Sequence, residues 1–94
     1  MKYTFTAVFT PEENGLISVS FPDLQGCYTC GDDIDDAFYM AQDVLNLTLY
    51  DLEQDNKPIP IANSQSNIIM TGNQFTSDIA VDTDVYHRLY KTTY

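Results

Sequence analysis

The order of strand and turn signals before the first helix constrains the fold more than any other feature of this sequence. Apolar side chains alternate with serines over residues 16–21, which is the period of a β-strand. Pro22 follows at once, and strand pairing should stop there because proline has a fixed φ and no backbone N–H. Gly26 and Gly31 allow backbone angles that a side chain would resist, and an aspartate at 32–33 can cap a helix. The segment therefore predicts a strand, a tight turn, a second short strand and a helix.

Further segments complete a predicted sheet. Residues 3–10 alternate aromatic or small apolar side chains with mostly threonine, which predicts a half-buried opening strand. Asn14 and Gly15 are typical of a hairpin turn between this strand and the next. Residues 26–30 predict the short third strand, and residues 75–81 alternate again and predict the last one. The first three strands should form an antiparallel meander.

A single long helix is predicted from Asp33 to about Gln54. Apolar residues recur there at steps of three and four, which makes one apolar stripe. The stripe consists of Ile34, Ala37, Phe38, Ala41, Val44, Leu45, Leu49 and Leu52. At ~1.5 Å per residue the helix is about 33 Å long, enough to cross the sheet, and the prolines at 58 and 60 end it. We expect a core in which helix residues meet strand residues: Phe38, Val44, Leu45 and Leu49 against Phe5, Ile17, Val19 and Phe21.

Two segments carry weaker patterns. Residues 61–74 are rich in Asn, Ser and Gln and predict a loop, in which residues 68–70 form a short apolar run typical of a brief edge strand. Within residues 82–94, apolar and aromatic spacing indicates one or two helical turns. The residues that give this spacing are Val85, Tyr86, Leu89 and Tyr90.

The charge of the chain narrows the choice of partner. Fourteen Asp and Glu stand against four Lys and Arg, for a formal net charge of −10 over 94 residues. Phosphate backbones repel such a chain, so we expect no direct binding of nucleic acid by this segment. The acid excess suits a basic protein partner, and it equally suits a solvated surface that only aids solubility. No apolar run approaches the ~18 residues that a membrane span needs, and the N-terminus has no signal-peptide pattern, so we expect a cytoplasmic protein.

Side chains that often carry chemistry do not form a convincing site. Cys27 and Cys30 make a C-x-x-C pattern, but the single His87 leaves too few further ligands for zinc. Both cysteines lie on a predicted strand, where residues three apart point to opposite faces, so a redox pair is disfavoured. No nucleophile accompanies His87 in a recognisable motif. We therefore expect no catalytic residue, no metal and no cofactor.

The aspartates around the helix start allow two interpretations. Asp32, Asp33, Asp35 and Asp36 lie in or just before the first turn, where the helix dipole and the free N–H groups favour carboxylates. Some of them can instead form a face that contacts a partner. Their spacing does not match a calcium-binding loop.

Linked motifs along the chain resemble one known family. The segment that carries most of the resemblance is Phe21-Pro22-Asp23-Leu24-Gln25-Gly26-Cys27, followed by Gly31-Asp32 and Asp36-Ala37. With Tyr3-Thr4-Phe5 before it and Pro58-Ile59-Pro60 after it, the chain resembles the HicB family of antitoxins, well over residues 1–62 and loosely over 63–94. The resemblance implies an α+β fold of the partial ribonuclease-H-like type, in the order β-β-β-α-β. That fold is an antiparallel sheet of three to four strands packed by one long helix.

The resemblance also implies a function. The chain would be an antitoxin that binds a small basic HicA-like mRNA interferase toxin and neutralises it by occluding its active site. It would not be an enzyme, because the opening strand, residues 3–10, has no carboxylate to hold a nuclease metal. We also expect a homo-oligomer, a dimer or higher. The alternative is a stand-alone acidic module that binds a protein or a ligand without a toxin partner.

The same resemblance suggests how the chain divides and what touches the partner. Residues 1–82 would be the toxin-binding domain, and residues 83–94 a C-terminal extension or the start of a DNA-binding module that family members commonly carry. The residues predicted to contact the toxin are Asp23, Asp32, Asp35 and Asp36 at a charged rim and Leu24 as an apolar contact.

Overall fold

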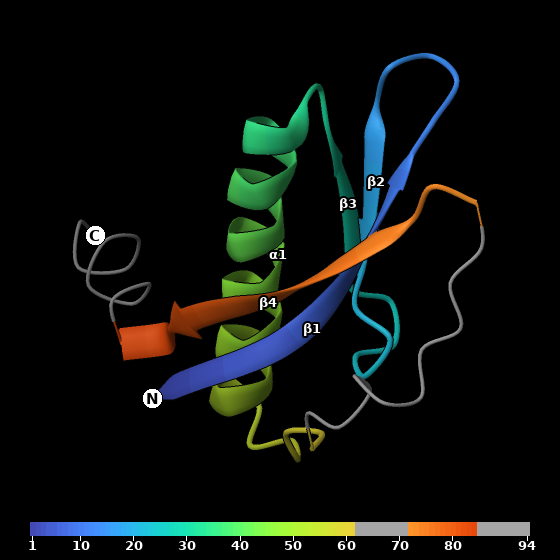
Figure 1. The fold of residues 1–94 in the computed structure, drawn as a ribbon. Helices are drawn as coiled ribbons and strands as arrows, with labels where there is room; N and C mark the ends of the chain where they lie inside the picture. Colours follow the sequence, from blue (N-terminus) through green and yellow to red (C-terminus); the bar gives the residue numbers. More distant parts are fainter. Residues whose placement is uncertain (62–71, 85–94) are drawn as a thin grey trace.

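The computed structural model describes residues 1–61 and 72–84 as one sheet with one helix across it (Figure 1). The strands are β1 (Lys2–Pro11), β2 (Ile17–Ser20), β3 (Tyr28–Gly31) and β4 (Phe75–Asp82), and the helix is α1 (Ile34–Gln54). All strand pairs are antiparallel, in the order β3-β2-β1-β4. The predicted α+β fold and the β-β-β-α-β order are confirmed. The second and third strands are shorter or displaced by one or two residues from their predicted bounds.

β1 is the strand on which the sheet is built. Its first eight residues pair with β4, from Lys2 opposite Asp82 to Phe9 opposite Phe75. Its last four pair with β2, so Val8 and Phe9 have a paired strand on both sides. Odd-numbered residues of β1 face α1, and Phe9 at the centre is 0% exposed. The inner face predicted from the alternation is buried, but Thr6 and Val8 on the other face are buried as well, so this part of the strand is not half-buried as predicted.

The turn after β2 folds back on itself. The backbone N–H of Leu24 donates to the Phe21 carbonyl at 3.0 Å, and the N–H of Cys27 donates to the Leu24 carbonyl at 3.2 Å. The N–H of Phe21 in turn donates to the Cys27 carbonyl at 3.1 Å. Gly26 has φ +78, the left-handed region that favours glycine. Pro22 ends the strand as expected, and the closed turn directs Leu24 inward.

Gly31 is required for a different reason from the one expected. Its φ is not positive, so it has no special backbone angle. Instead the first turn of α1 passes so close that a Cβ on Gly31 would lie 2.3 Å from the backbone nitrogen of Ala37. Glycine here lets the helix turn back directly over the strand that precedes it.

The core lies between α1 and the inner face of the sheet. Leu45 and Leu49 are 0% exposed, while Phe38 and Val44 are partly buried at its margin. The predicted stripe is confirmed except at its first member, because Ile34 is 45% exposed. Ile34 is the first residue of α1.

Several predictions for the C-terminal third concern residues outside the described ones. The edge strand at 68–70, the helical turns built on residues 85–90 and the position of His87 all belong to this group. Among the described residues, no helix is long and apolar enough to cross a membrane.

The helix face can be tested by one pair of substitutions. Leu45→Ala should lower the free energy of unfolding by ~2–5 kcal/mol, because it removes a fully buried side chain and leaves a cavity. Asp43→Ala on the same helix should change it by about 0.5 kcal/mol or less, because Asp43 lies off the buried stripe. Urea unfolding of both variants measures the difference, and equal losses would show that the buried face is misassigned.

Candidate functional site

Two of the four helix-start aspartates are occupied by capping α1. Asp33 is the N-cap, and its Oδ1 accepts a hydrogen bond from the Asp36 backbone N–H at 2.8 Å. Asp36 in turn accepts a hydrogen bond at its Oδ2 from the backbone N–H of Asp32, the residue before the N-cap, at 2.9 Å. This arrangement is close to a capping box and satisfies donors that the helix itself leaves unpaired. The capping interpretation is therefore confirmed for Asp33 and Asp36. Contact of the other aspartates with a partner stays a prediction.

Asp32 and Asp35 remain available for a partner. Both side chains are exposed, and neither carboxylate forms a hydrogen bond or ion pair within the described residues. Asp36 was predicted at the charged rim, but its carboxylate is committed to the backbone of the residue before the cap. Changing Asp36 would disturb the helix start as well as any contact.

The hairpin between β1 and β2 brings further carboxylates to the same end of the molecule. The register places Pro11 opposite Ile17 and Ile17 opposite Gly31, so the hairpin and the helix start lie at one end of the sheet (Figure 1). This surface, which we call the acidic end, consists of Glu12, Glu13, Asp32, Asp33, Asp35 and Asp36. The described residues carry two basic side chains. Lys2 is the first residue of β1 and Lys57 lies shortly after α1, both at the opposite end of the domain. The opposite end also carries carboxylates, those of Asp51, Glu53, Asp55, Asp82 and Asp84, so what distinguishes the acidic end is that no basic side chain of the described residues lies there.

Glu12 and Glu13 were not predicted as site residues. They lie in the connection between β1 and β2, and their proximity to the helix start depends on the pairing of three strands. A shallow hollow of about 570 Å³ lies beside them, lined by Glu12, Glu13, Asn14, Leu16, Ser18 and Cys30. The Ser18 hydroxyl donates to Glu12 Oε1 at 3.0 Å, which holds this carboxylate over the outer face of the sheet.

In the turn between β2 and β3, the structure differs from the prediction that Leu24 is an apolar contact for the toxin. Leu24 is only 4% exposed and belongs to the core. It was expected at an exposed turn tip, but the hydrogen bonds that close the turn draw its side chain inward. Leu24 therefore offers no apolar surface to a partner. Asp23 beside it is half-buried.

The C-x-x-C pattern does not form a dithiol site. Cys27 is buried and Cys30 is exposed, and both are free thiols. Burial raises the pKa of the Cys27 thiol, and the Thr48 hydroxyl lies 3.5 Å from its sulfur. A raised pKa is the opposite of what an attacking thiolate requires. Within residues 1–61 and 72–84, no group of three His, Cys, Asp or Glu side chains is placed to hold a metal.

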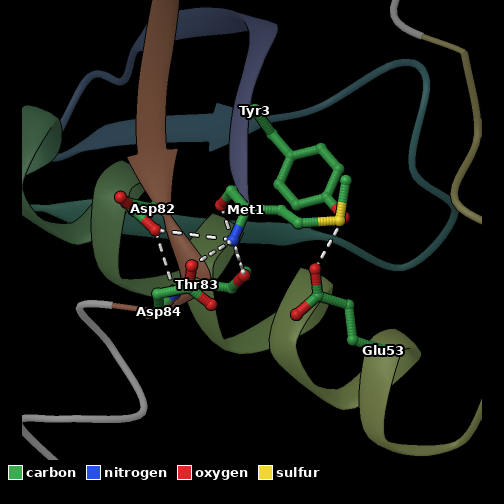
Figure 2. A network of polar contacts seen from close by, with 6 residues as sticks. All are labelled: Met1, Tyr3, Glu53, Asp82, Thr83 and Asp84. Atoms are coloured by element: carbon green, nitrogen blue, oxygen red, sulfur yellow. Dashed lines mark hydrogen bonds and ion pairs between the residues drawn. The ribbon is translucent and has the colours of Figure 1, made fainter.

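A second polar network lies at the opposite end of the domain (Figure 2). The Met1 ammonium lies 3.0 Å from Asp84 Oδ2 and 3.6 Å from Asp82 Oδ1, and it donates to the Thr83 hydroxyl at 3.2 Å. The hydrogen bond to Asp84 raises the pKa of this ammonium. The network joins the start of β1 to the end of β4. No motif in the sequence could have predicted it, because its two halves are about eighty positions apart.

Tyr3 links the same strand to the last turn of α1. Its hydroxyl donates to Glu53 Oε2 at 2.6 Å, as Figure 2 shows. This hydrogen bond, with a smaller contribution from desolvation, raises the pKa of Tyr3 to about 12. A shallow hollow of about 640 Å³ beside it is lined by Met1, Tyr3, Glu53, Asn56, Lys57 and Ile59. Its walls combine apolar and charged groups.

The Tyr3 contact predicts a specific response to alkaline pH. The fold favours the neutral phenol, so the contact stabilises the protein fully below the ordinary tyrosine pKa of about 10. That contribution should disappear as the pH rises through the folded-state pKa of about 12. Glu53→Gln should move the Tyr3 pKa back toward its ordinary value, because it removes the charged acceptor. NMR titration of the Tyr3 ring, assigned with Tyr3→Phe, measures this; an unchanged midpoint in Glu53→Gln would contradict the assigned cause.

Comparison of the whole fold with solved structures gives close matches at low sequence identity. A toxin-antitoxin complex from Streptococcus pneumoniae contains a chain that matches with a TM-score of 0.77 and 22% identity, over 92% of this chain and 73% of that one. The N-terminal domain of the Burkholderia pseudomallei antitoxin HicB matches with a TM-score of 0.72 and 15% identity, over 85% of this chain and 99% of that one. A HicA3 and HicB3 toxin-antitoxin complex gives 0.67 and 16%, again over 85% and 99%.

Sequence comparison gives the family. No protein of curated function matches the sequence significantly. A family profile described as the HicB_like antitoxin of bacterial toxin-antitoxin system matches residues 5–92, which includes α1, β2, β3 and β4 in full and β1 from Phe5 onward. The chain therefore belongs to the HicB-like antitoxin family of bacterial toxin-antitoxin systems.

Proposed function

We propose that this chain binds a small basic HicA-like mRNA interferase and neutralises it by covering its active site. Family membership supports an antitoxin role, and the net charge of −10 supports a cationic partner. The observation that carries the proposal is the acidic end, where six carboxylates gather on one surface of a chain of net charge −10. An RNA-cleaving toxin needs a positive surface for its substrate, and an acidic domain can compete for that surface.

The acidic end would act mainly on the encounter. Complementary charges at the rim of an interface speed association and select the partner, whereas buried contacts hold the complex. Asp32 and Asp35 are the carboxylates that the fold leaves exposed and uncommitted, and Glu12 and Glu13 extend the same surface. In this proposal the chain does no chemistry of its own: we expect no RNA cleavage by the pure protein. The toxin-binding unit would be residues 1–82, and the chain would act as a homo-oligomer.

Co-expression tests the function as a whole. The reading frame next to the gene for this chain should encode a small basic protein that arrests growth when expressed alone. Expression of this chain with it should restore growth, and the two proteins should co-purify. The proposal fails if the neighbouring product is toxic and this chain neither rescues growth nor co-purifies with it; a neighbour that is neither basic nor toxic would favour the stand-alone module.

The charged rim predicts a salt-dependent defect. Asp32→Lys with Asp35→Lys should slow association with the toxin at low salt, because two uncommitted carboxylates of the acidic end become cations. The defect should shrink near 1 M salt, where the screening length is about 3 Å. Stopped-flow association rates measure both effects.

A matched control separates local from overall charge. Asp51→Lys with Asp55→Lys makes the same change in net charge on two exposed residues at the far end of α1. It should slow association much less. Equal slowing by both pairs would show that only net charge matters and that the acidic end is not the docking surface.

A further inference from the structure

The sheet has two edges of unequal character. β3 forms one edge of the sheet and has four residues, and the start of α1 passes closely over its last residue. β4 forms the other edge and has eight residues, and none of the described residues pairs with its outer side. Figure 1 shows β4 running along the flank of β1 and ending near the N-terminus. A long edge strand presents a row of backbone donors and acceptors that another strand can pair with.

Proteins usually protect such an edge with lysine, proline or a bulge. Residues 75–82 contain neither lysine nor proline. The register with β1 runs without interruption over eight consecutive pairs, so this strand has no bulge on that side. The charged residues on β4 are Asp78 and Asp82, both on the face away from α1. Within the part of the chain that the structure describes, the edge is therefore open to a strand, and its negative charge selects against an acidic strand.

The side chains of β4 indicate what kind of strand fits. Toward α1, Phe75 and Val81 are only partly buried although both pack on the core. The Phe75 ring stacks on Phe9 at 4.9 Å with an interplanar angle of 3°, which fixes its position. On the outer face Asp78 is exposed, and its Oδ1 accepts from the Thr6 hydroxyl at 2.9 Å. A neighbouring strand would thus meet apolar side chains on one face and a fixed carboxylate on the other.

We infer that the outer edge of β4 accepts an extended segment of the partner protein as a fifth strand of the sheet. The segment would place apolar residues beside Phe75 and Val81 and a lysine or arginine opposite Asp78, since strand side chains alternate between faces. This inference rests on the proposed function for the existence of a basic partner. A second copy of the chain fits poorly, because pairing two β4 edges would bring the aspartates of both copies to one seam between molecules of net charge −10 each.

Hydrogen exchange of the complex tests the pairing directly. In the free protein, alternate amides of residues 75–82 should be protected by β1 and the others should exchange fast. Addition of the basic protein encoded by the neighbouring reading frame should protect the second, alternating set. If that protein binds and is neutralised while these amides stay unprotected, the inference is wrong and the proposed function stands. If it does not bind at all, both fail.

A pair of lysine substitutions gives a second readout. Ala80→Lys adds a cation to the exposed outer face of β4 and should weaken binding of the same partner about tenfold, through repulsion of a basic strand. Ser20→Lys adds the same charge to the same face on β2, away from the edge, and should change affinity about twofold or less. Equal weakening by both variants would overturn the inference. So would protection of the β4 amides by raised concentration of this chain alone, which would assign the edge to a second copy.

Discussion

The packing of Phe9 holds the described structure together. Its ring lies 4.6 Å from the Phe38 ring on α1 and 4.9 Å from the Phe75 ring on β4. One side chain therefore ties the central strand to the helix on one side and to the last strand on the other. Aromatic pairs at these separations contribute beyond the area that they bury. The β4 edge depends on this cluster, because the Phe9–Phe75 contact attaches β4 to β1.

The local patterns of the sequence predicted the fold well. The apolar alternation of β1, the stripe of α1 and the stop at Pro22 each depend on neighbours within a few positions, and all three were placed correctly. A glycine at position 31 was expected for its backbone freedom, but it is needed because a Cβ there would collide with the backbone of Ala37, six residues further along the chain. The sequence shows that a small residue is present, and only the packing shows which atoms require it.

The candidate site was less predictable, because it is built from distant segments. Asp36 looks the same as Asp35 in the sequence, yet a hydrogen bond to the backbone commits one and leaves the other exposed. Leu24 follows a Pro-Asp pair that favours an exposed turn, and three backbone hydrogen bonds decide that it is buried. Glu12 and Glu13 join the acidic end only through strand register. Tertiary pairing, which a single sequence does not display, determined each outcome.

The pairing of β4 with β1 has a consequence for the order in which the domain forms. β1, β2, β3 and α1 follow one another within residues 2–54, so their contacts are short in sequence. β4 must return across about seventy positions to reach β1, and such long-range closure is slow relative to local pairing. During synthesis the acidic end would thus be complete before residues 75–82 have left the ribosome. The charged surface that attracts a partner would exist first, and the sheet edge that we assign to the partner's strand would be added last.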